Sequence, residues 1–156
     1  MQRIHNTETK DKAGQDVCIK GWVHTRRNMG KIVFLDMRDR SGIVQVVIVP
    51  SELSETPLET VTQIRSEYVL EIFGTVQNRG EKQINAEMDT GRVEILAKNI
   101  KILSAAQTTP FEIDNEEKFV NEELRLKYRY LDLRKERMKK NMNTLLPKLW
   151  GLEKRP

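Results

Sequence analysis

The chain has 156 residues, of which 38% are hydrophobic and 32% are charged, and it carries a formal net charge of +4. This composition is typical of one folded globular domain plus an appendage and excludes a disordered protein. No apolar run reaches the roughly 18 residues of a membrane span, and the start MQRIHNTETKDK has no apolar signal-peptide core, so we expect no membrane partner and a cytoplasmic location.

Period-two alternation of apolar residues predicts three strands in the first part of the chain. Turn-forming residues separate them, and Gly30 in the first turn is expected to adopt a positive φ. The three predicted strands are Asp16–Arg27, with a bend at Gly21, then Ile32–Asp39 and Ile43–Val49. Cys18 is the single cysteine and is expected to be a small buried residue of the first strand. With only His5 and His24 as further ligands, no metal site is predicted.

The alternation within Ile32–Asp39 assigns its side chains to two faces of the strand. One face carries Ile32, Phe34, Asp36 and Arg38, and the other carries Val33, Leu35, Met37 and Asp39. Charged side chains are therefore expected on both faces of a strand that is otherwise mostly apolar.

The spacing of apolar residues changes after the third strand. Leu58, Val61 and Ile64 lie three residues apart, which predicts a short amphipathic helix within Ser51–Glu67, with Ser51 or Ser54 as its N-cap. Strands resume over Tyr68–Val76 and Val93–Leu103. Three strands, one helix and two strands is the order of the OB-fold, so the chain is predicted to be mainly β, with a five-stranded Greek-key barrel and one inserted helix over residues 1–104.

The last third of the chain differs in composition from the predicted barrel. Residues 105–120 contain Thr-Thr-Pro and scattered acids, which is typical of a linker. Asn121 is expected to cap a hinge helix over 121–142. Pro147 would cost about 3 kcal/mol inside a helix, so 143–156 is expected to be an atypical tail. The basic residues expected on a solvated helix face are Arg125, Lys127, Arg129, Arg134, Lys135, Arg137, Lys139 and Lys140.

Three blocks of the sequence, in this order and spacing, carry a family resemblance. They are GWVHTRRNMGKIVFLDMRDRSGIVQVVIV, TGRVEIL and RLKYRYLDLR. Together they closely resemble the amino-terminal part of bacterial-type aspartyl-tRNA synthetase, a class II aminoacyl-tRNA synthetase, from about residue 14 to residue 142. Lysyl- and asparaginyl-tRNA synthetases share the barrel, but RYLDLR favours the aspartyl branch.

The resemblance implies an anticodon-binding barrel joined by a hinge to a catalytic domain that uses ATP and Mg²⁺. The 156 residues are too few to include that catalytic domain, so this chain is expected to have no catalytic residue, no cofactor and no enzyme activity of its own. The parent family is homodimeric, and we expect this shorter chain to be a monomer.

The resemblance also implies which residues touch the anticodon. Phe34 is expected to stack on a base, which contributes roughly 1–3 kcal/mol with little dependence on base identity. Arg27, Gln45 and Glu94 are expected to read the polar edges of exposed bases. A second group is expected to contribute from flanking loops: Arg26, Lys31, Arg79, Gln83 and Asn85. Trp22 is instead expected to pack against or shape the barrel.

Two questions remain open at this point. The charges Asp36, Arg38, Asp39 and Arg40 either form cross-strand ion pairs at the rim of the barrel or contact RNA directly. The partner is expected to be a tRNA with the aspartate anticodon, with acceptance of the asparagine tRNA left open. The alternative is a free-standing OB-fold protein that binds single-stranded nucleic acid or serves as an accessory protein.

Overall fold

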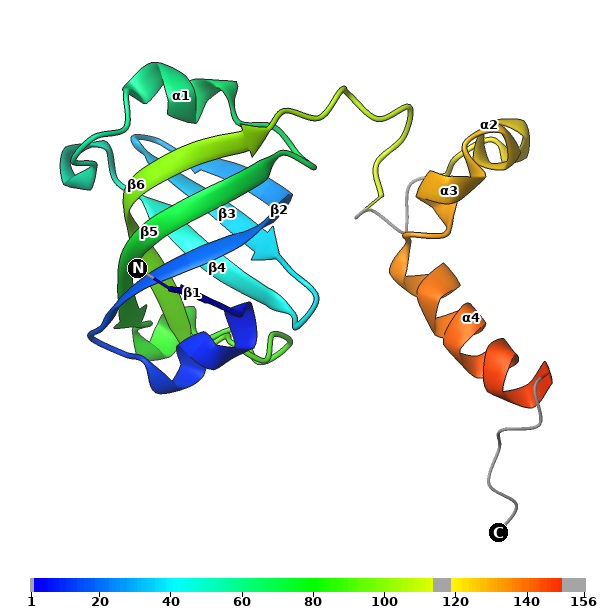
Figure 1. The fold of residues 1–156 in the computed structure, drawn as a ribbon, viewed down its shortest axis with the longest axis horizontal. Helices are drawn as coiled ribbons and strands as arrows, with labels where there is room; N and C mark the ends of the chain where they lie inside the picture. The colour runs from blue at the N-terminus through cyan, green and yellow to red at the C-terminus, as the bar shows by residue number, and fades with distance from the viewer. Residues whose placement is uncertain (1, 114–118, 150–156) are drawn as a thin grey trace, which may run out of the picture. The chain divides into compact units, whose positions relative to one another are not determined.

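The structure is a computed structural model that describes residues 2–113 and 119–149. The chain divides into two compact units, Met1–Gln107 and Thr108–Pro156, which are considered separately below. The first unit contains all the strands within the described residues, and the second contains the helices α2, α3 and α4 (Figure 1).

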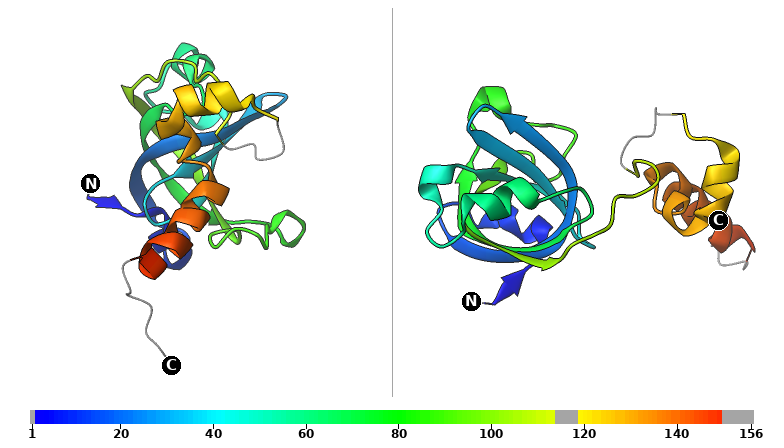
Figure 2. Two further views of the ribbon diagram at one scale, coloured as in Figure 1. Left: turned by 90° about the vertical axis from the view of Figure 1, so that its right-hand side faces the viewer. Right: turned by 90° about the horizontal axis from the view of Figure 1, so that it is seen from above.

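The first unit is a closed β-barrel. Its sheet has the order β1-β2-β3-β4-β6-β5, and an additional pairing of β2 with β5 closes the ring, as the view from above shows (Figure 2). The predicted five-stranded barrel is therefore confirmed, with the short strand β1 added to β2. The strands are β1 (Arg3–Ile4), β2 (Asp16–Met29), β3 (Ile32–Arg38), β4 (Ile43–Ile48), β5 (Val69–Asn78) and β6 (Val93–Ser104).

Short helices occupy the connections of the barrel. Helix α1 (Leu58–Gln63) lies at one end of it, and the 3₁₀ helix η1 (Asn6–Asp11) lies at the other (Figure 1). The inserted helix was predicted, but its N-cap was predicted wrongly. Pro57 stands at the N-cap position and starts the helix, while Ser51 belongs to a separate 3₁₀ helix, η2 (Pro50–Glu52). A further 3₁₀ helix, η3 (Glu81–Gln83), follows β5.

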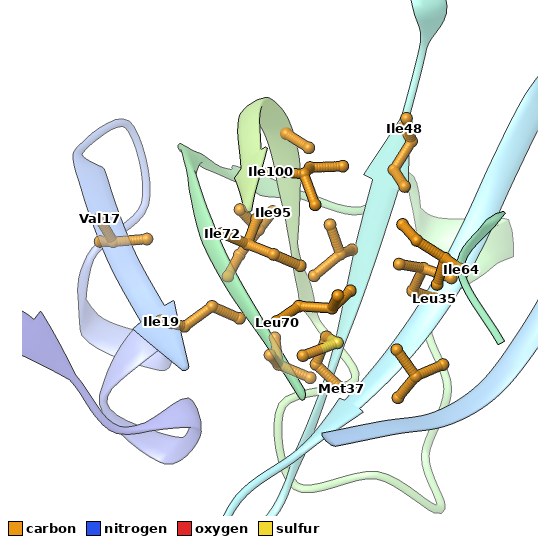
Figure 3. Packing of buried hydrophobic residues seen from close by; sticks show 14 of the residues in the cluster. Val17, Ile19, Leu35, Met37, Ile48, Ile64, Leu70, Ile72, Ile95 and Ile100 are labelled. Carbon is orange, nitrogen blue, oxygen red and sulfur yellow. The ribbon is translucent and has the colours of Figure 1, made fainter. Parts of the chain in front are cut away.

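Apolar side chains from every strand of the ring fill the barrel (Figure 3). Leu35, Ile72 and Ile95 are fully buried, and α1 adds Val61 and Ile64 to the same cluster. Burial of this apolar area is the main stabilising contribution to the unit. Cys18 is buried as expected.

Glycine is favoured at two positions of the barrel, one in a turn and one between closely packed strands. Gly30 has φ +62, which confirms the positive φ predicted for the first turn. A side chain at Gly74 would place its Cβ 2.2 Å from the Leu96 carbonyl oxygen on β6, so only glycine fits there. Trp22 is 42% exposed, so its ring lies outside the buried core, and its expected part in packing against or shaping the barrel stays a prediction.

The charges at the end of β3 differ in role. Arg38 pairs with Glu67 at 3.2 Å, and the Arg40 Nη2 lies 3.0 Å from His5 Nε2. Asp39 is buried and instead accepts hydrogen bonds from the backbone N–H groups of Asn6, Ser41 and Gly42. The ion-pair expectation therefore holds for Arg38. The main partners of Asp39 are backbone donors, and His5 Nδ1 lies 3.3 Å from its Oδ2.

The second unit is helical but is not built around one hinge helix. The expected helix over 121–142 is divided into α2 (Glu122–Lys127), α3 (Arg129–Asp132) and α4 (Glu136–Leu149). The predicted N-cap is confirmed, because Asn121 Oδ1 accepts a 2.9 Å hydrogen bond from the Glu123 backbone N–H. The chain leaves helical geometry at Tyr128, which has φ −110 and ψ 46, and this ends the first helix.

A small core holds α2 and α3 together. Phe111, Ile113 and Leu131 are buried in it, so part of the expected linker 105–120 packs into the helical unit; 114–118 lie outside the described residues. Beside this core, the Asp132 carboxylate is fully buried and accepts hydrogen bonds from Arg125 at 2.8 Å and Arg129 at 2.6 Å. The hydrogen bond from Arg125 is the main reason that the pKa of Asp132 lies below the ordinary value.

The solvated basic face predicted for this region is wrong in part. Arg125 is tied to Asp132, and Lys135 is only 7% exposed, with its Nζ 5.6 Å from the centre of the Phe111 ring. The prediction failed for these two side chains because Phe111 and Asp132 were not recognised as their buried partners.

Helix α4 also departs from expectation. It continues through Pro147 to Leu149, so the proline does not end the helix, and the expectation of an atypical tail over 143–156 stays a prediction. Pro147 has no backbone N–H to donate to the Asn143 carbonyl, so the helix lacks that one hydrogen bond and ends two residues later. Gly151 lies outside the described residues. Within the described ranges, no helix is both long enough and apolar enough to cross a membrane.

Candidate nucleic-acid interface

The interface is built on the outer faces of the neighbouring strands β3, β4 and β6. On β3, Leu35 and Met37 point into the core, while Phe34 and Asp36 are partly exposed, as the alternation predicts. The same alternation exposes Gln45 on β4 and Glu94 on β6. Because these strands pair directly with one another, their outward side chains lie next to one another across the sheet.

The outward polar side chains form a continuous hydrogen-bonded row. Arg27 Nη2, from the end of β2, lies 3.1 and 3.2 Å from the two Asp36 oxygens and 3.1 Å from Gln45 Oε1. Gln45 Nε2 then donates a 2.9 Å hydrogen bond to Glu94 Oε2. We call Asp36, Arg27, Gln45, Glu94 and Arg79 the polar row. Three residues predicted as base readers from the family resemblance, Arg27, Gln45 and Glu94, are thus brought into direct contact.

Arg79 forms the buried end of the polar row. Its Nε donates a 3.1 Å hydrogen bond to the Val93 carbonyl and lies 3.6 Å from Glu94 Oε2. The Arg79 side chain is only 3% exposed, whereas that of Arg27 is 52% exposed. Burial lowers the pKa of Arg79, and the Glu94 carboxylate opposes this effect. The charge is retained, because an arginine is always protonated in a protein.

Phe34 lies beside the polar row in an apolar strip. It pairs with Val47 on β4, and Val47 pairs with Leu96 on β6, so Phe34, Val47 and Leu96 follow one line across three strands. Phe34 is also the register partner of Arg27 on β2. The ring is half-buried, which leaves part of it available to a stacking base. A ring next to a row of fixed polar groups is the arrangement that single-stranded RNA recognition requires.

Arg26 does not join the polar row. Consecutive residues of a strand point to opposite faces, and Arg26 Nη1 donates a 2.9 Å hydrogen bond to the Ile64 carbonyl at the end of α1. Burial and the nearby Arg65 lower its pKa. Its proximity to Arg27 in the sequence therefore does not make it a neighbour on the same surface.

The remaining candidates lie on loops. Lys31 is exposed in the turn between β2 and β3, and Gln83 is exposed on η3. Asn85 is partly buried and accepts a 3.0 Å hydrogen bond from the Glu87 backbone N–H, which shapes its own loop. None of these three is bonded to the polar row within the described residues.

Asp36 is the member of the row that sequence reasoning did not include among the site residues. Its side chain is 15% exposed and both of its oxygens face Arg27. The available signal was its position two residues from Phe34, which places both on one face of β3. The alternating charges from Asp36 to Arg40 predicted an ion pair for Asp36 correctly, but they did not identify Arg27 as its partner.

The closed five-stranded barrel, with α1 after its third strand and an outward ring beside polar groups, defines an OB-fold of the kind that binds single-stranded nucleic acid. Comparison with known families agrees. The chain belongs to the tRNA anticodon family of OB-fold nucleic acid binding domains, whose model matches residues 17–103.

Curated relatives give a more specific likeness. The chain is 48% identical over 130 residues to an aspartate–tRNA ligase of Staphylococcus carnosus and 50% identical over 130 residues to one of Bacillus licheniformis. Each match covers 83% of this chain but 22% of the relative. The chain therefore corresponds to a minor part of the length of these relatives.

Solved structures agree with the fold. An asparaginyl-tRNA synthetase from Pyrococcus horikoshii, complexed with asparaginyl-adenylate, matches with a TM-score of 0.71 and 25% identity, covering 98% of this chain and 35% of that one. An aspartyl-tRNA synthetase from Entamoeba histolytica has the same TM-score of 0.71 at 24% identity, covering 86% and 33%. At the latter identity the likeness describes the fold alone.

Proposed function

We propose that this chain recognises the anticodon of a tRNA, as the OB-fold domain of an aspartyl-tRNA synthetase. The observation that supports this most is the polar row, in which Arg27, Gln45 and Glu94 are hydrogen-bonded to one another and flank the half-buried ring of Phe34. In this proposal, one anticodon base stacks on Phe34 while the exposed donors and acceptors of the row bind base edges.

The preferred partner in this proposal is a tRNA with the aspartate anticodon. The identity of about half to aspartate–tRNA ligases supports this choice. Acceptance of the asparagine tRNA would be measured by adding a hairpin with the asparagine anticodon as a further competitor in the binding experiment below. Lys31 and Gln83, which are exposed on loops, would contact the backbone or neighbouring bases.

We further propose that the chain binds without catalysing aminoacylation. The matched part of the chain covers 22% of the length of the curated ligases. Within this chain, the family model matches only the barrel, residues 17–103. An ATP–pyrophosphate exchange assay with aspartate is expected to give no signal above background. Measurable exchange would contradict this part of the proposal. We also expect the chain to be a cytoplasmic monomer. Sedimentation velocity would test its oligomeric state.

A competition experiment tests the binding proposal. A labelled hairpin with the aspartate anticodon is bound first and is then displaced by the same unlabelled hairpin, by a hairpin with a scrambled anticodon, or by an unstructured oligonucleotide of equal length. We expect the matched hairpin to compete best, and binding to weaken as salt rises because phosphate contacts release counterions. Equal competition by the unstructured oligonucleotide would instead support a general single-strand-binding protein.

A further inference from the structure

The order of hydrogen-bond donors and acceptors along the polar row is fixed by the chemistry of its members. A guanidinium can only donate hydrogen bonds and a carboxylate can only accept them, whereas an amide has one accepting and one donating end. Gln45 lies between Arg27 and Glu94. Its oxygen must therefore face Arg27 and its nitrogen must face Glu94. The reversed amide would oppose donor to donor and acceptor to acceptor, and would lose both hydrogen bonds.

The two ends of the row are held by residues that are themselves shielded from solvent. Asp36 takes one end, with both oxygens within 3.2 Å of Arg27 Nη2. That nitrogen has only two N–H groups, so one is directed at Asp36 and the other at Gln45. Arg79 takes the other end, with its charge 3.6 Å from Glu94 Oε2, the same oxygen that accepts from Gln45.

The burial of Arg79 supports a role in positioning. Its Nη2 is buried and has no hydrogen-bond partner within the described residues. Leaving a buried charged donor unpaired is unfavourable. Such a group is uncommon in a folded protein and is expected mainly where function requires it. The Arg79 guanidinium, 3.6 Å from Glu94 Oε2, holds that carboxylate in one direction.

We propose that Asp36 and Arg79 are positioning residues that fix the hydrogen-bond polarity of the row. Arg27, Gln45 and Glu94 then meet a nucleobase with one preset order of groups, in which donors stand toward β2 and an acceptor stands toward β6. Within the described residues, the second Glu94 oxygen accepts no hydrogen bond, so it supplies that acceptor. A base edge binds best when its acceptors lie toward Arg27 and its donor lies toward Glu94.

The role in base choice rests on the proposed function, but the polarity itself can be measured without RNA. The side-chain amide protons of Gln45 are followed by nuclear magnetic resonance in ¹⁵N-labelled protein, with Gln45→Ala used to assign them. In Asp36→Asn, which preserves shape but removes the charge that holds Arg27, their exchange with water is expected to accelerate about 3- to 10-fold. An unchanged exchange rate would overturn the proposal.

Glu67→Gln is the matched control. It removes the charge of Glu67, the ion-pair partner of Arg38. Arg38 lies on the same face of β3 as Asp36 but has no bond to the polar row within the described residues. The Gln45 amide exchange rate is expected to be the same in this variant as in the unchanged chain. Acceleration equal to that of Asp36→Asn would show a general loosening of the barrel and would overturn the specific role.

RNA binding then tests base choice. The measured quantity is the ratio of affinities for the aspartate anticodon hairpin and for hairpins with one anticodon base replaced. Asp36→Asn and Arg79→Lys are expected to reduce this ratio about 3- to 10-fold, with much smaller changes in affinity for the scrambled hairpin, because stacking on Phe34 remains. Equal weakening for all hairpins would overturn the polarity role. No preference in the unchanged chain would reject the proposed function, while the amide exchange would still decide the polarity.

Discussion

The barrel and the helical unit are stabilised in different ways. The barrel closes on itself, so each of its five ring strands has a partner on both sides, and its interior is a single large apolar cluster. The helical unit buries only Phe111, Ile113 and Leu131, with a few partly buried neighbours. It compensates with Asp132, a fully buried carboxylate that joins two arginines.

Both units leave some large apolar side chains in water, and in the barrel Met29 is 68% exposed and Leu58 56%. In the helical unit Phe119 is 92% exposed, Leu126 62% and Tyr130 64%. Large apolar side chains that remain in water contribute nothing to burial. The comparison indicates that apolar burial determines the stability of the barrel, whereas a small set of ionic contacts has a proportionally larger effect in the helical unit.

The largest expected effect is that of a core truncation in the barrel. Ile72 is fully buried at the middle of β5, and Ile72→Ala is expected to lower the free energy of unfolding by about 2–5 kcal/mol through lost burial and the remaining cavity. Urea unfolding followed by circular dichroism in the β-sheet region would measure it. A loss below about 1 kcal/mol would show that the core relaxes around the deletion, which a closed barrel should resist.

Asp132→Asn is the corresponding test of the helical unit. We expect a loss of about 2–4 kcal/mol in that unit, less than for a fully buried pair because Arg125 and Arg129 are partly exposed. Amide hydrogen exchange should show faster opening of α2 and α3 with no change in the barrel strands. Equal acceleration in β5 would contradict the view that the two units have separate determinants of stability.

The barrel was more predictable from sequence than the helical unit, for a physical reason. Its strands alternate in the sequence, because one side of each strand faces the core, and β3 follows this pattern through Leu35 and Met37. The helical unit depends on contacts between residues that no local pattern connects, such as Phe111 with Lys135. The breaks between α2, α3 and α4 likewise have no proline or glycine in that segment to predict them.

The interface was predictable in its members but not in its connections. Arg27, Phe34, Gln45 and Glu94 were suggested by family resemblance, and the structure brings the three polar ones into hydrogen-bonding contact. The burial of Arg79 is set by the loop after β5 and by the carbonyl of Val93, which have no sequence signal. The three-dimensional arrangement was therefore needed to separate the residues proposed to read bases from the residues proposed to position them.

Acid should weaken the barrel through Asp39. Burial alone would raise the pKa of this carboxyl, but hydrogen bonds from Ser41, Asn6 and Gly42 hold it below the ordinary value of 3.8. A depressed folded-state pKa means that the stabilisation is complete above the ordinary value and is lost as the pH falls through the depressed one.

Asp39→Asn provides the comparison for this pH dependence. The variant is expected to lose about 1.5–3 kcal/mol at neutral pH, because charge-assisted hydrogen bonds are replaced by neutral ones. Its unfolding free energy should also vary less between pH 5 and pH 2 than that of the unchanged chain. Parallel pH curves for the two proteins would exclude Asp39 as a source of acid sensitivity.

Phe34→Ala separates stacking from polar recognition at the interface. Because the ring is half-buried on the outer surface, the barrel is expected to remain folded. Affinity for all tRNA hairpins should fall by about 1–3 kcal/mol. Gln45→Ala should instead reduce mainly the preference for the matched anticodon. If Phe34→Ala altered preference without lowering general affinity, the proposed division between the apolar strip and the polar row would be wrong.

The smallest expected effect is that of Lys31→Ala. Lys31 is exposed in the β2–β3 turn, close in sequence to Arg27 and Phe34 but without a bond to the polar row within the described residues. If it contacts a phosphate, affinity should fall a few-fold for every hairpin, and the slope of log affinity against log salt should decrease by about 0.7, the value for one contact to a single strand. Lys12→Ala, a partly exposed lysine next to η1, is the control and should leave the slope unchanged. A loss of base preference in Lys31→Ala would instead place this side chain among the base-reading groups, because a phosphate contact carries no sequence information.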